Sequence, residues 1–316
     1  MPFIPESTYH APFWLPGGHA QTIFPALFRR VGHVTNLTER LELPDGDFID
    51  VAWTGKRSRH LAILSHGLEA SMGTEYIQGM AAALMRAGWD VLAWNFRGCG
   101  GEANRLLRMY HSGATEDLHA VIRHAVDNHP AETIDLIGFS LGGNLTLKLL
   151  GEDPDNLPPQ IRSGVAFSTP CDLACSSRQL SLFSNKLYME RFLIAMRSKV
   201  RAKKLMFPDL LDLTGLERIR TFQEFDDRYT APIHGFMNAE DYWKRNSCRQ
   251  FLPSIRVPTL LVNAVNDPFL GPGCHPREEA EGSSHFHFEL PATGGHVGFP
   301  TTGDSDENWM ESRALE

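Results

Sequence analysis

The stretch "TIDLIGFSLGGNLTLKLL" (residues 133–150) decides the fold, because it joins an apolar run to a helical pattern through a serine flanked by glycines. Its first seven residues are typical of a strand that is buried on both faces of a sheet. The segment Gly138-Phe139-Ser140-Leu141-Gly142 fits Gly-x-Ser-x-Gly, in which the serine occupies a sharp strand-to-helix turn that needs small neighbours. This context predicts that Ser140 presents its hydroxyl as a nucleophile. An ordinary strand-to-helix turn is the alternative.

Strand-like and helical segments alternate on both sides of this stretch. The other predicted strands are residues 61–65, 90–95, 163–168, 259–264 and 285–290, with an antiparallel edge strand at residues 48–53. The predicted helices are residues 75–88, 114–128, 141–151 and 185–205. Such alternation favours an α/β fold with a mostly parallel, doubly wound sheet.

One long interval, from Ser168 to Thr259, contains no convincing strand. A structureless loop of this length is uncommon in a compact domain. We therefore expect a single domain, residues 1–316, with a helical cap inserted at about residues 170–250. The apolar cap residues are predicted either to line an acyl-chain tunnel or to pack on the domain, and they include Phe183, Leu187, Phe192 and Leu193.

The amino-acid composition limits the possible binding partners and cellular location of the protein. The formal net charge of −8 and the pI near 6.0 argue against nucleic acid, which recruits basic surfaces. Five cysteines without a Cys-x-x-Cys pair indicate reduced thiols rather than disulfides or a zinc site. No signal peptide is evident, and no apolar run approaches the roughly 20 residues of a transmembrane helix. These features predict a cytoplasmic protein.

Two residues downstream of Ser140 are candidates to activate it. A serine hydroxyl needs a base, and an imidazole serves best when a carboxylate fixes its tautomer. Asp267 follows the predicted strand at 259–264, and His296 lies on a glycine-rich loop after the last predicted strand. The order Ser, Asp, His is the one found with this type of serine turn. Alone, Asp267 is equally typical of a turn, and His296 of a surface histidine; together with Ser140 they favour a triad.

Other carboxylates compete with Asp267 for the role of the acid. Asp172 follows the predicted strand at 163–168 and is the main rival. Asp226 and Asp227 are weaker candidates because they lie inside the predicted cap.

A tetrahedral intermediate also requires donors for its oxyanion. One donor is predicted to be the backbone N–H of Leu141, which follows the serine. The second is predicted to be the N–H of Leu68, in the loop "HGLEAS" that follows the strand at 61–65. His66 in that loop is interpreted as a residue that organises the turn rather than as a second base.

With these residues in place, the chain resembles the α/β-hydrolase superfamily and, within it, the YheT-like branch. The resemblance extends over nearly the whole chain and rests on these blocks: "HGLEAS" (66–71), "NFRGCGGEANR" (95–105), "YHSGATEDL" (110–118), "GFSLGGN" (138–144), "FDDRYTAPIHGF" (225–236), "NAVNDPF" (263–269) and "GGHVGF" (294–299). It implies the α/β-hydrolase fold, a triad of Ser140, Asp267 and His296, and hydrolysis of carboxylic esters.

Several residues in these blocks carry no assigned chemistry. Arg97 and Arg105 are expected either to anchor loops through ion pairs or to receive an anionic substrate group. His111 and Tyr229 are expected either to line the pocket or to serve packing and hydrogen bonding. His285 and His287 alternate on one strand, but no third ligand stands out, so no metal and no other cofactor is predicted.

The sequence thus predicts a serine esterase that acts on a small-molecule ester through an acyl-enzyme. Acyl transfer to another acceptor and thioester cleavage use the same triad, and the sequence does not separate them from ester hydrolysis. A binding module that retains the fold without catalysis is the remaining alternative, since a fold does not fix a function. The physiological ester and the oligomeric state are left open.

Overall fold

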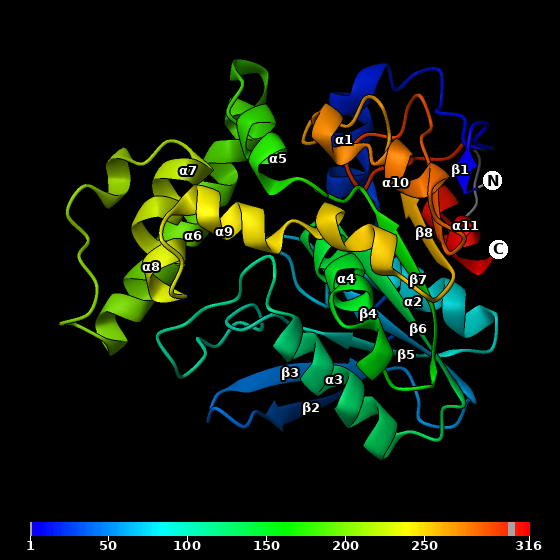
Figure 1. Cartoon of the computed structure of the whole chain (residues 1–316), viewed down its shortest axis with the longest axis horizontal. Helices are drawn as coiled ribbons and strands as arrows, with labels where there is room; N and C mark the ends of the chain where they lie inside the picture. Colours follow the sequence, from blue (N-terminus) through cyan, green and yellow to red (C-terminus); the bar gives the residue numbers. More distant parts are fainter. Residues whose placement is uncertain (1, 303–306) are drawn as a thin grey trace.

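A computed structural model describes residues 2–302 and 307–316 and shows one central sheet covered by helices on both faces (Figure 1). The strand order is β1-β9-β8-β7-β6-β4-β5-β3-β2, and the pairs from β1 to β5 in this order are parallel. The strands are β1 (Phe3–Ile4), β2 (Leu37–Glu42), β3 (Phe48–Trp53), β4 (His60–Ser65), β5 (Asp90–Trp94), β6 (Thr133–Phe139), β7 (Ile161–Phe167), β8 (Thr259–Val262) and β9 (Phe286–Glu289).

The helices fill the connections between these strands. They are α1 (Gly17–Phe28), α2 (Glu75–Arg86), α3 (Thr115–Asn128), α4 (Leu141–Glu152), α5 (Leu173–Leu180), α6 (Lys186–Met206), α7 (Phe222–Phe225), α8 (Ala231–Ile233), α9 (Ala239–Asn246), α10 (Arg277–Glu281) and α11 (Trp309–Leu315). The predicted α/β class with a mostly parallel sheet is confirmed.

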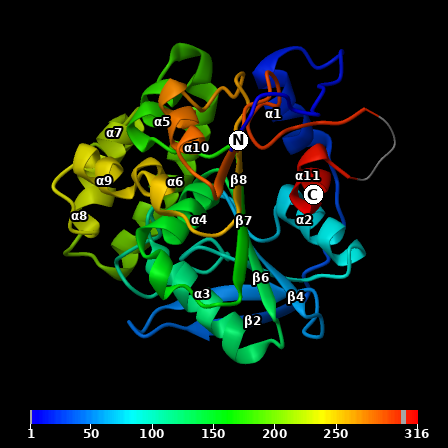
Figure 2. The same cartoon turned by 45° about the vertical axis from the view of Figure 1, so that its right-hand side comes forward.

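Alternating side chains on the strands pack into two layers. On β4, Leu61 and Ile63 face the cluster that contains residues of α3 and α4, whereas Ala62 and Leu64 face the cluster that contains residues of α2 and α11. Figure 2 shows these two helix layers on opposite sides of the sheet. Burial on both faces explains why the central strands are continuous apolar runs, which made them recognisable in the sequence.

The edges of the sheet differ from the prediction. β3 is not an edge strand, because β2 pairs with it on its outer side in antiparallel register. The sequence of β2, "LTERLE", has only two apolar residues and is mostly exposed, so it carries no apolar run. β1 has two residues and was also missed. Both strands depend on a neighbour rather than on a pattern of their own.

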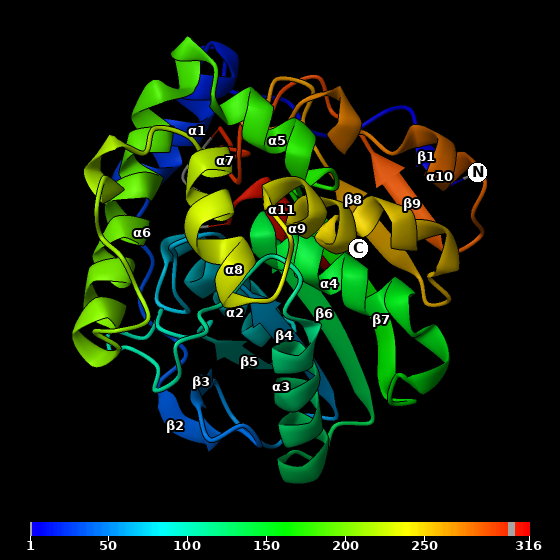
Figure 3. The same ribbon diagram turned by 60° about the vertical axis from the view of Figure 1, so that its left-hand side comes forward.

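Helices α5 to α9 lie between β7 and β8, where the sequence predicted a cap, and they project beyond the sheet (Figures 1 and 3). We call residues 173–246 the helical insertion. In a third hydrophobic cluster, Met189, Leu193 and Val200 of α6 pack with Phe225 and Tyr229, and loop residues outside the insertion, such as Met109 and Phe269, complete it. This cluster is separate from the two sheet layers and packs the insertion onto loops at the strand ends.

Candidate active site

Three of the predicted side chains meet at the carboxyl ends of the strands. Ser140 follows β6, Asp267 follows β8 and His296 follows β9. Ser140 Oγ lies 2.9 Å from His296 Nε2, and His296 Nδ1 lies 2.9 and 3.1 Å from the two carboxylate oxygens of Asp267. These distances are within hydrogen-bond range, so a continuous path joins the hydroxyl, the imidazole and the carboxylate.

Ser140 occupies a backbone conformation that few residues other than glycine adopt. Its φ is 53° and its ψ is −118°, between the last residue of β6 and the first of α4. Such a conformation costs on the order of 1–3 kcal/mol and persists only where the surroundings impose it. The strained turn lifts the hydroxyl away from the sheet toward His296. This distinguishes the segment from an ordinary strand-to-helix turn.

The two glycines of the motif are required by space. A Cβ at Gly138 would lie under 3.0 Å from backbone atoms of Gly142 and Gly143. A Cβ at Gly142 would lie under 3.0 Å from the carbonyl oxygens of Ser65 and His66, at the end of β4. Helix α4 therefore approaches the sheet more closely than any residue with a side chain would allow.

Burial and stacking fix the imidazole of His296. The Asp267 side chain is inaccessible to solvent, and its Oδ1 also accepts the N–H of Phe269 at 2.8 Å. The Phe269 ring stacks on the imidazole, with ring centroids 4.1 Å apart and an interplanar angle of 30°. His296 can therefore neither rotate freely nor lose its carboxylate partner.

The predicted oxyanion donors lie on either side of the serine. Leu68 and Leu141 line the same cavity as Ser140 and His296, and neither backbone N–H donates a hydrogen bond within the described residues. Both N–H groups are thus available to a substrate oxygen. Donors of this kind are most effective when they are held in place before the charge develops.

His66 holds the loop that carries Leu68. Its Nε2 accepts the N–H of Phe96 at 3.1 Å, so the proton is on Nδ1, which donates to the Gly67 carbonyl at 2.8 Å. Complete burial lowers the pKa of His66 to about 3, which keeps the ring neutral. Both ring nitrogens are occupied by the backbone. His66 is a turn-organising residue, as interpreted from the sequence.

Helix α1 contributes contacts that the sequence analysis missed. Gln21 Oε1 accepts from Asn266 Nδ2 at 2.9 Å and from the N–H of Gly294 at 2.8 Å. Thr22 Oγ1 accepts the N–H of His296 at 2.8 Å. The buried polar pair Gln21 and Thr22 thus ties the loops of Asp267 and His296 together. Two adjacent polar residues before the apolar run at residues 23–28 were the available signal.

Two spaces meet at Ser140 and His296. The inner cavity runs beneath the helical insertion, has an empty volume of about 970 Å³ including its mouth, and is walled mainly by apolar side chains such as Met109, Leu180, Met196, Phe222 and Phe225. The outer groove, of about 1380 Å³, runs between α1 and α6. Leu68, Glu69, Phe192 and Phe269 border both spaces.

Comparisons with known proteins place this arrangement in a family. A family model described as "alpha/beta hydrolase fold" matches residues 63–301. The Escherichia coli (strain K12) protein YheT, whose name assigns it provisionally to the esterases, is 36% identical over 302 residues, which cover 93% of this chain and 88% of YheT. The chain belongs to the α/β-hydrolase fold family. The identity with YheT confirms the predicted YheT-like branch.

More distant relatives of this α/β-hydrolase are also named for ester cleavage. Mouse phospholipase ABHD3 is 28% identical over 308 residues, covering 94% of this chain and 74% of its own. Among solved structures, the Pyrococcus furiosus esterase Pf2001 superimposes with a TM-score of 0.58 at 20% identity, over 90% of this chain and 95% of the esterase. At that identity the superposition supports the fold alone.

Two other candidate site residues of this α/β-hydrolase bind groups of the protein itself. Asp172, the rival acid, caps α5 by accepting the N–H of Cys175 at 2.9 Å. Arg97 is buried and pairs with Asp117, Asp45 and Asp47 at 2.7–3.0 Å. An ion pair rather than a substrate anion therefore accounts for its charge.

Arg105, Tyr229 and His111 also make contacts within the protein. Arg105 pairs with Glu42 on the surface. Tyr229 donates its hydroxyl to the Asp212 carbonyl at 2.7 Å and is buried in the core of the insertion. His111 does line the inner cavity, where its Nδ1 accepts the N–H of Gly113 at 3.2 Å. Burial holds the pKa of His111 well below its usual value.

The apolar residues expected to line a tunnel divide into three groups. Phe192 lines both spaces, and Leu193 is buried in the core of the insertion. Phe183 and Leu187, in contrast, are 89% and 85% exposed. The prediction is wrong for these two, because they lie on the outer side of the chain segment that begins α6.

No group of three or more His, Cys, Asp or Glu side chains able to hold a metal ion occurs in the described part of this α/β-hydrolase. His285 hydrogen-bonds Ser284 on the surface.

Within residues 2–302 and 307–316, no helix is long and apolar enough to cross a membrane.

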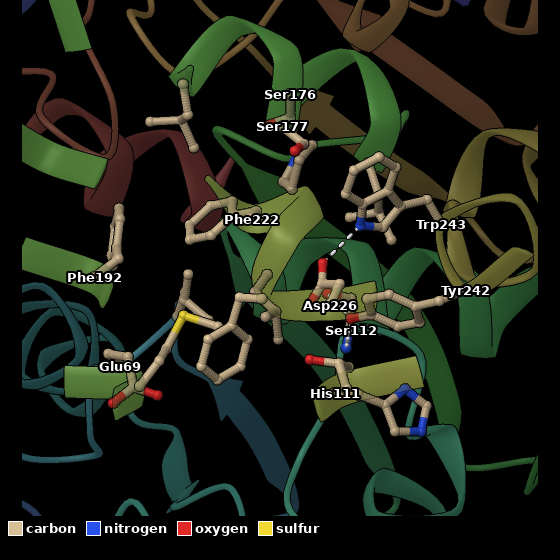
Figure 4. A pocket seen from close by; sticks show the side chains of 18 of the residues that line it. Glu69, His111, Ser112, Ser176, Ser177, Phe192, Phe222, Asp226, Tyr242 and Trp243 are labelled. Atoms are coloured by element: carbon tan, nitrogen blue, oxygen red, sulfur yellow. Dashed lines mark hydrogen bonds between the residues drawn. The ribbon is translucent and has the colours of Figure 1, made fainter. Parts of the chain in front are cut away.

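One carboxyl group faces the inner cavity away from the serine. Asp226 is buried, lines the cavity and accepts the indole N–H of Trp243 at 2.8 Å (Figure 4). It begins a π-helical turn, Asp226–Thr230, a rare geometry that is frequent at functional sites. Burial raises the pKa of Asp226 to about 7, so the cavity contains a carboxyl that is largely protonated below neutral pH.

Replacing Asp226 by asparagine is expected to stabilise the protein more at pH 8 than at pH 5. In the unfolded chain the carboxyl ionises near its ordinary pKa of 3.8, whereas in the folded protein it resists ionisation up to about 7. The free energy of unfolding therefore falls as the pH rises from 3.8 to about 7, by at most about 4 kcal/mol in total. Asparagine keeps the bond to Trp243 and removes the loss. Urea unfolding of both proteins at the two pH values measures the effect, and an equal difference at both would contradict it.

Proposed function

We propose that this protein hydrolyses carboxylic esters through an acyl-enzyme formed on Ser140. The proposal rests on one observation above all, the hydrogen-bonded path from Ser140 Oγ through His296 to the buried Asp267. It agrees with the relatives, which are named as an esterase and a phospholipase, and with the sequence prediction of a carboxylic ester hydrolase.

In the proposed acylation step, Ser140 Oγ attacks the ester carbonyl carbon while His296 Nε2 takes the hydroxyl proton. Asp267 holds the imidazole in the tautomer that leaves Nε2 free and stabilises the imidazolium that forms. The carbonyl oxygen becomes an oxyanion, which accepts the N–H groups of Leu68 and Leu141. Each such donor is worth about 3 kcal/mol of transition-state stabilisation.

Collapse of this intermediate breaks the bond to the alcohol, and the alcohol oxygen takes the proton from His296 Nε2. A water molecule then attacks the acyl-enzyme and gives a proton to the same nitrogen, which returns it to Ser140 Oγ as the carboxylic acid leaves. We assign the acyl chain to the inner cavity because apolar side chains form most of its walls. The alcohol part then lies in the outer groove.

Replacing Ser140 by alanine tests the proposal. Hydrolysis of p-nitrophenyl butyrate is expected to fall by at least about 10⁴-fold in kcat/KM, since loss of the nucleophile disables the whole unit. Labelling by a fluorophosphonate probe is expected to disappear in parallel.

A matched control is available in the same cavity. Ser177 also lines the inner cavity, and Ser177→Ala is expected to retain both hydrolysis and labelling. Undiminished turnover by the Ser140 variant, or a folded parent protein that the probe does not label, would refute the proposal. The second outcome would favour the non-catalytic binding module. Analysis of products in the presence of alcohols separates hydrolysis from acyl transfer.

A further inference from the structure

The two segments that flank the outer groove carry many exposed apolar side chains. On the side of α1 these are Phe13, Trp14, Ile23, Leu27 and Phe28. On the side of α6 they are Leu182, Phe183, Leu187 and Ile194. We call these nine residues the apolar rim. They come from two short segments but make up about half of the large apolar side chains that the described residues expose, and such a concentration marks an interaction site.

Helices α1 and α6, which carry most of the apolar rim, form opposite walls of the groove. Ile23 and Leu27 of α1 line one wall, and Tyr188 and Arg191 of α6 line the other. Where the walls meet, His19 and Tyr188 stack and are joined by a 3.2 Å contact between Nδ1 and the hydroxyl. Figure 3 shows α1 beside the start of α6. The two segments that carry the rim therefore flank the groove, which Ser140 and His296 also line.

The charge of these segments is opposite to that of the chain. Residues 7–38 contain two arginines and no Asp or Glu, and residues 173–201 contain six Lys or Arg and one Glu, whereas the whole chain has a net charge of −8. Four of these cations, Arg30, Arg178, Lys186 and Arg191, are exposed and make no ion pair with any described residue. An apolar surface with cations beside it matches the interface of a membrane that contains anionic lipid.

We propose that the apolar rim docks this protein on the surface of a bilayer containing anionic phospholipid, with the outer groove opening toward the lipid. Docking would place the groove where an ester could enter from the bilayer without crossing water. This use of the surface rests on the proposed ester hydrolysis, whereas the docking itself does not. A symmetric dimer through the same face is disfavoured, because it would bring the four cations of each copy close to those of the other.

Flotation with vesicles tests the docking independently of catalysis. The protein carries Ser140→Ala so that it cannot consume lipid, and the vesicles are phosphatidylcholine alone or phosphatidylcholine with a minor share of phosphatidylglycerol. We expect flotation with the mixed vesicles and much less with phosphatidylcholine alone. Arg30→Glu combined with Lys186→Glu is expected to remove this difference. Equal recovery with both vesicles would contradict the charge argument, and no recovery with either would overturn the proposal.

Two leucines of α6 form a matched pair that tests the contribution of apolar side chains to vesicle binding. Leu187 in the rim and Leu205 at the far end of the helix are 85% and 86% exposed, and neither lines the cavity or the groove. Leu187→Ser is expected to weaken vesicle binding about tenfold or more, the scale of one buried leucine side chain, whereas Leu205→Ser leaves it unchanged. Equal effects of the two variants would overturn the proposal.

Two further measurements separate the alternatives. Without Ser140→Ala, the Leu187 variant is expected to hydrolyse soluble p-nitrophenyl butyrate at the parent rate. If the parent itself is inactive but the Ser140→Ala protein still floats, the ester hydrolase proposal fails and the docking stands. Light scattering reports self-association: a dimer that Leu187→Ser dissociates would assign the rim to a second copy and overturn lipid docking.

Discussion

Replacing Asp267 by asparagine is expected to lower kcat/KM for a soluble ester by about 10⁴-fold while the protein stays folded. The cause is the second bond that the carboxylate makes. One oxygen of Asp267 accepts the N–H of Phe269 at 2.8 Å, and an asparagine oxygen would keep that bond. The asparagine NH₂ group would then face His296 Nδ1 and favour the tautomer with the proton on Nε2. In that tautomer the imidazole cannot take the proton of Ser140.

Asp172→Asn is the matched control. Asp172 was the rival for the acid in the sequence, but its carboxylate caps α5, and asparagine caps a helix about as well as aspartate. The control variant is expected to keep the parent activity and melting temperature. If Asp172→Asn lost activity as strongly as Asp267→Asn, or if Asp267→Asn remained active, the proposed role of Asp267 would be wrong.

Replacing Gly142 by alanine is expected to lower the free energy of unfolding by roughly 3 kcal/mol or more. The new Cβ would lie under 3.0 Å from the carbonyl oxygens of Ser65 and His66. These atoms are backbone, at the end of the central strand β4 and the start of the loop that carries Leu68, so they cannot move aside without disturbing the sheet. Urea unfolding followed by circular dichroism measures the loss. Activity is expected to fall as well, because α4 and Ser140 must shift.

The control for this substitution is Gly32→Ala. An added Cβ at Gly32 meets no atom within 4 Å, and its backbone is not in the left-handed region. We expect a change within about 0.5 kcal/mol. If Gly142→Ala were as mild as Gly32→Ala, the close approach of α4 to β4 could not be the reason for the second glycine of the motif.

The parts of the site that could be predicted are those with a local signal. Ser140 lies between a continuous apolar strand and a helix, and glycines on both sides mark the close approach. Asp267 and His296 each follow a strand, and parallel strands bring their carboxyl ends to one edge of the sheet. The order of these three residues, their positions after strands and the glycines around them together predicted that they meet.

The parts that could not be predicted depend on contacts between distant residues. Gln21 and Thr22 hold the loops of Asp267 and His296 from 245 to 274 positions away in sequence, and no periodic pattern predicts such contacts. The outward position of Leu187 depends on how α6 turns against the body of the insertion. Asp226 was set aside because it lies in the cap, yet the cap folds over the cavity and places that carboxyl inside it.

The hydrogen bond between Thr22 and His296 bears on the order of events during folding. It joins residues 274 positions apart and closes almost the whole chain into one loop. Contacts of such long range carry a large entropic cost before they are rewarded, so they tend to form late. During refolding, enzymatic activity would then appear later than secondary structure. The return of activity would mark the formation of this last long-range contact.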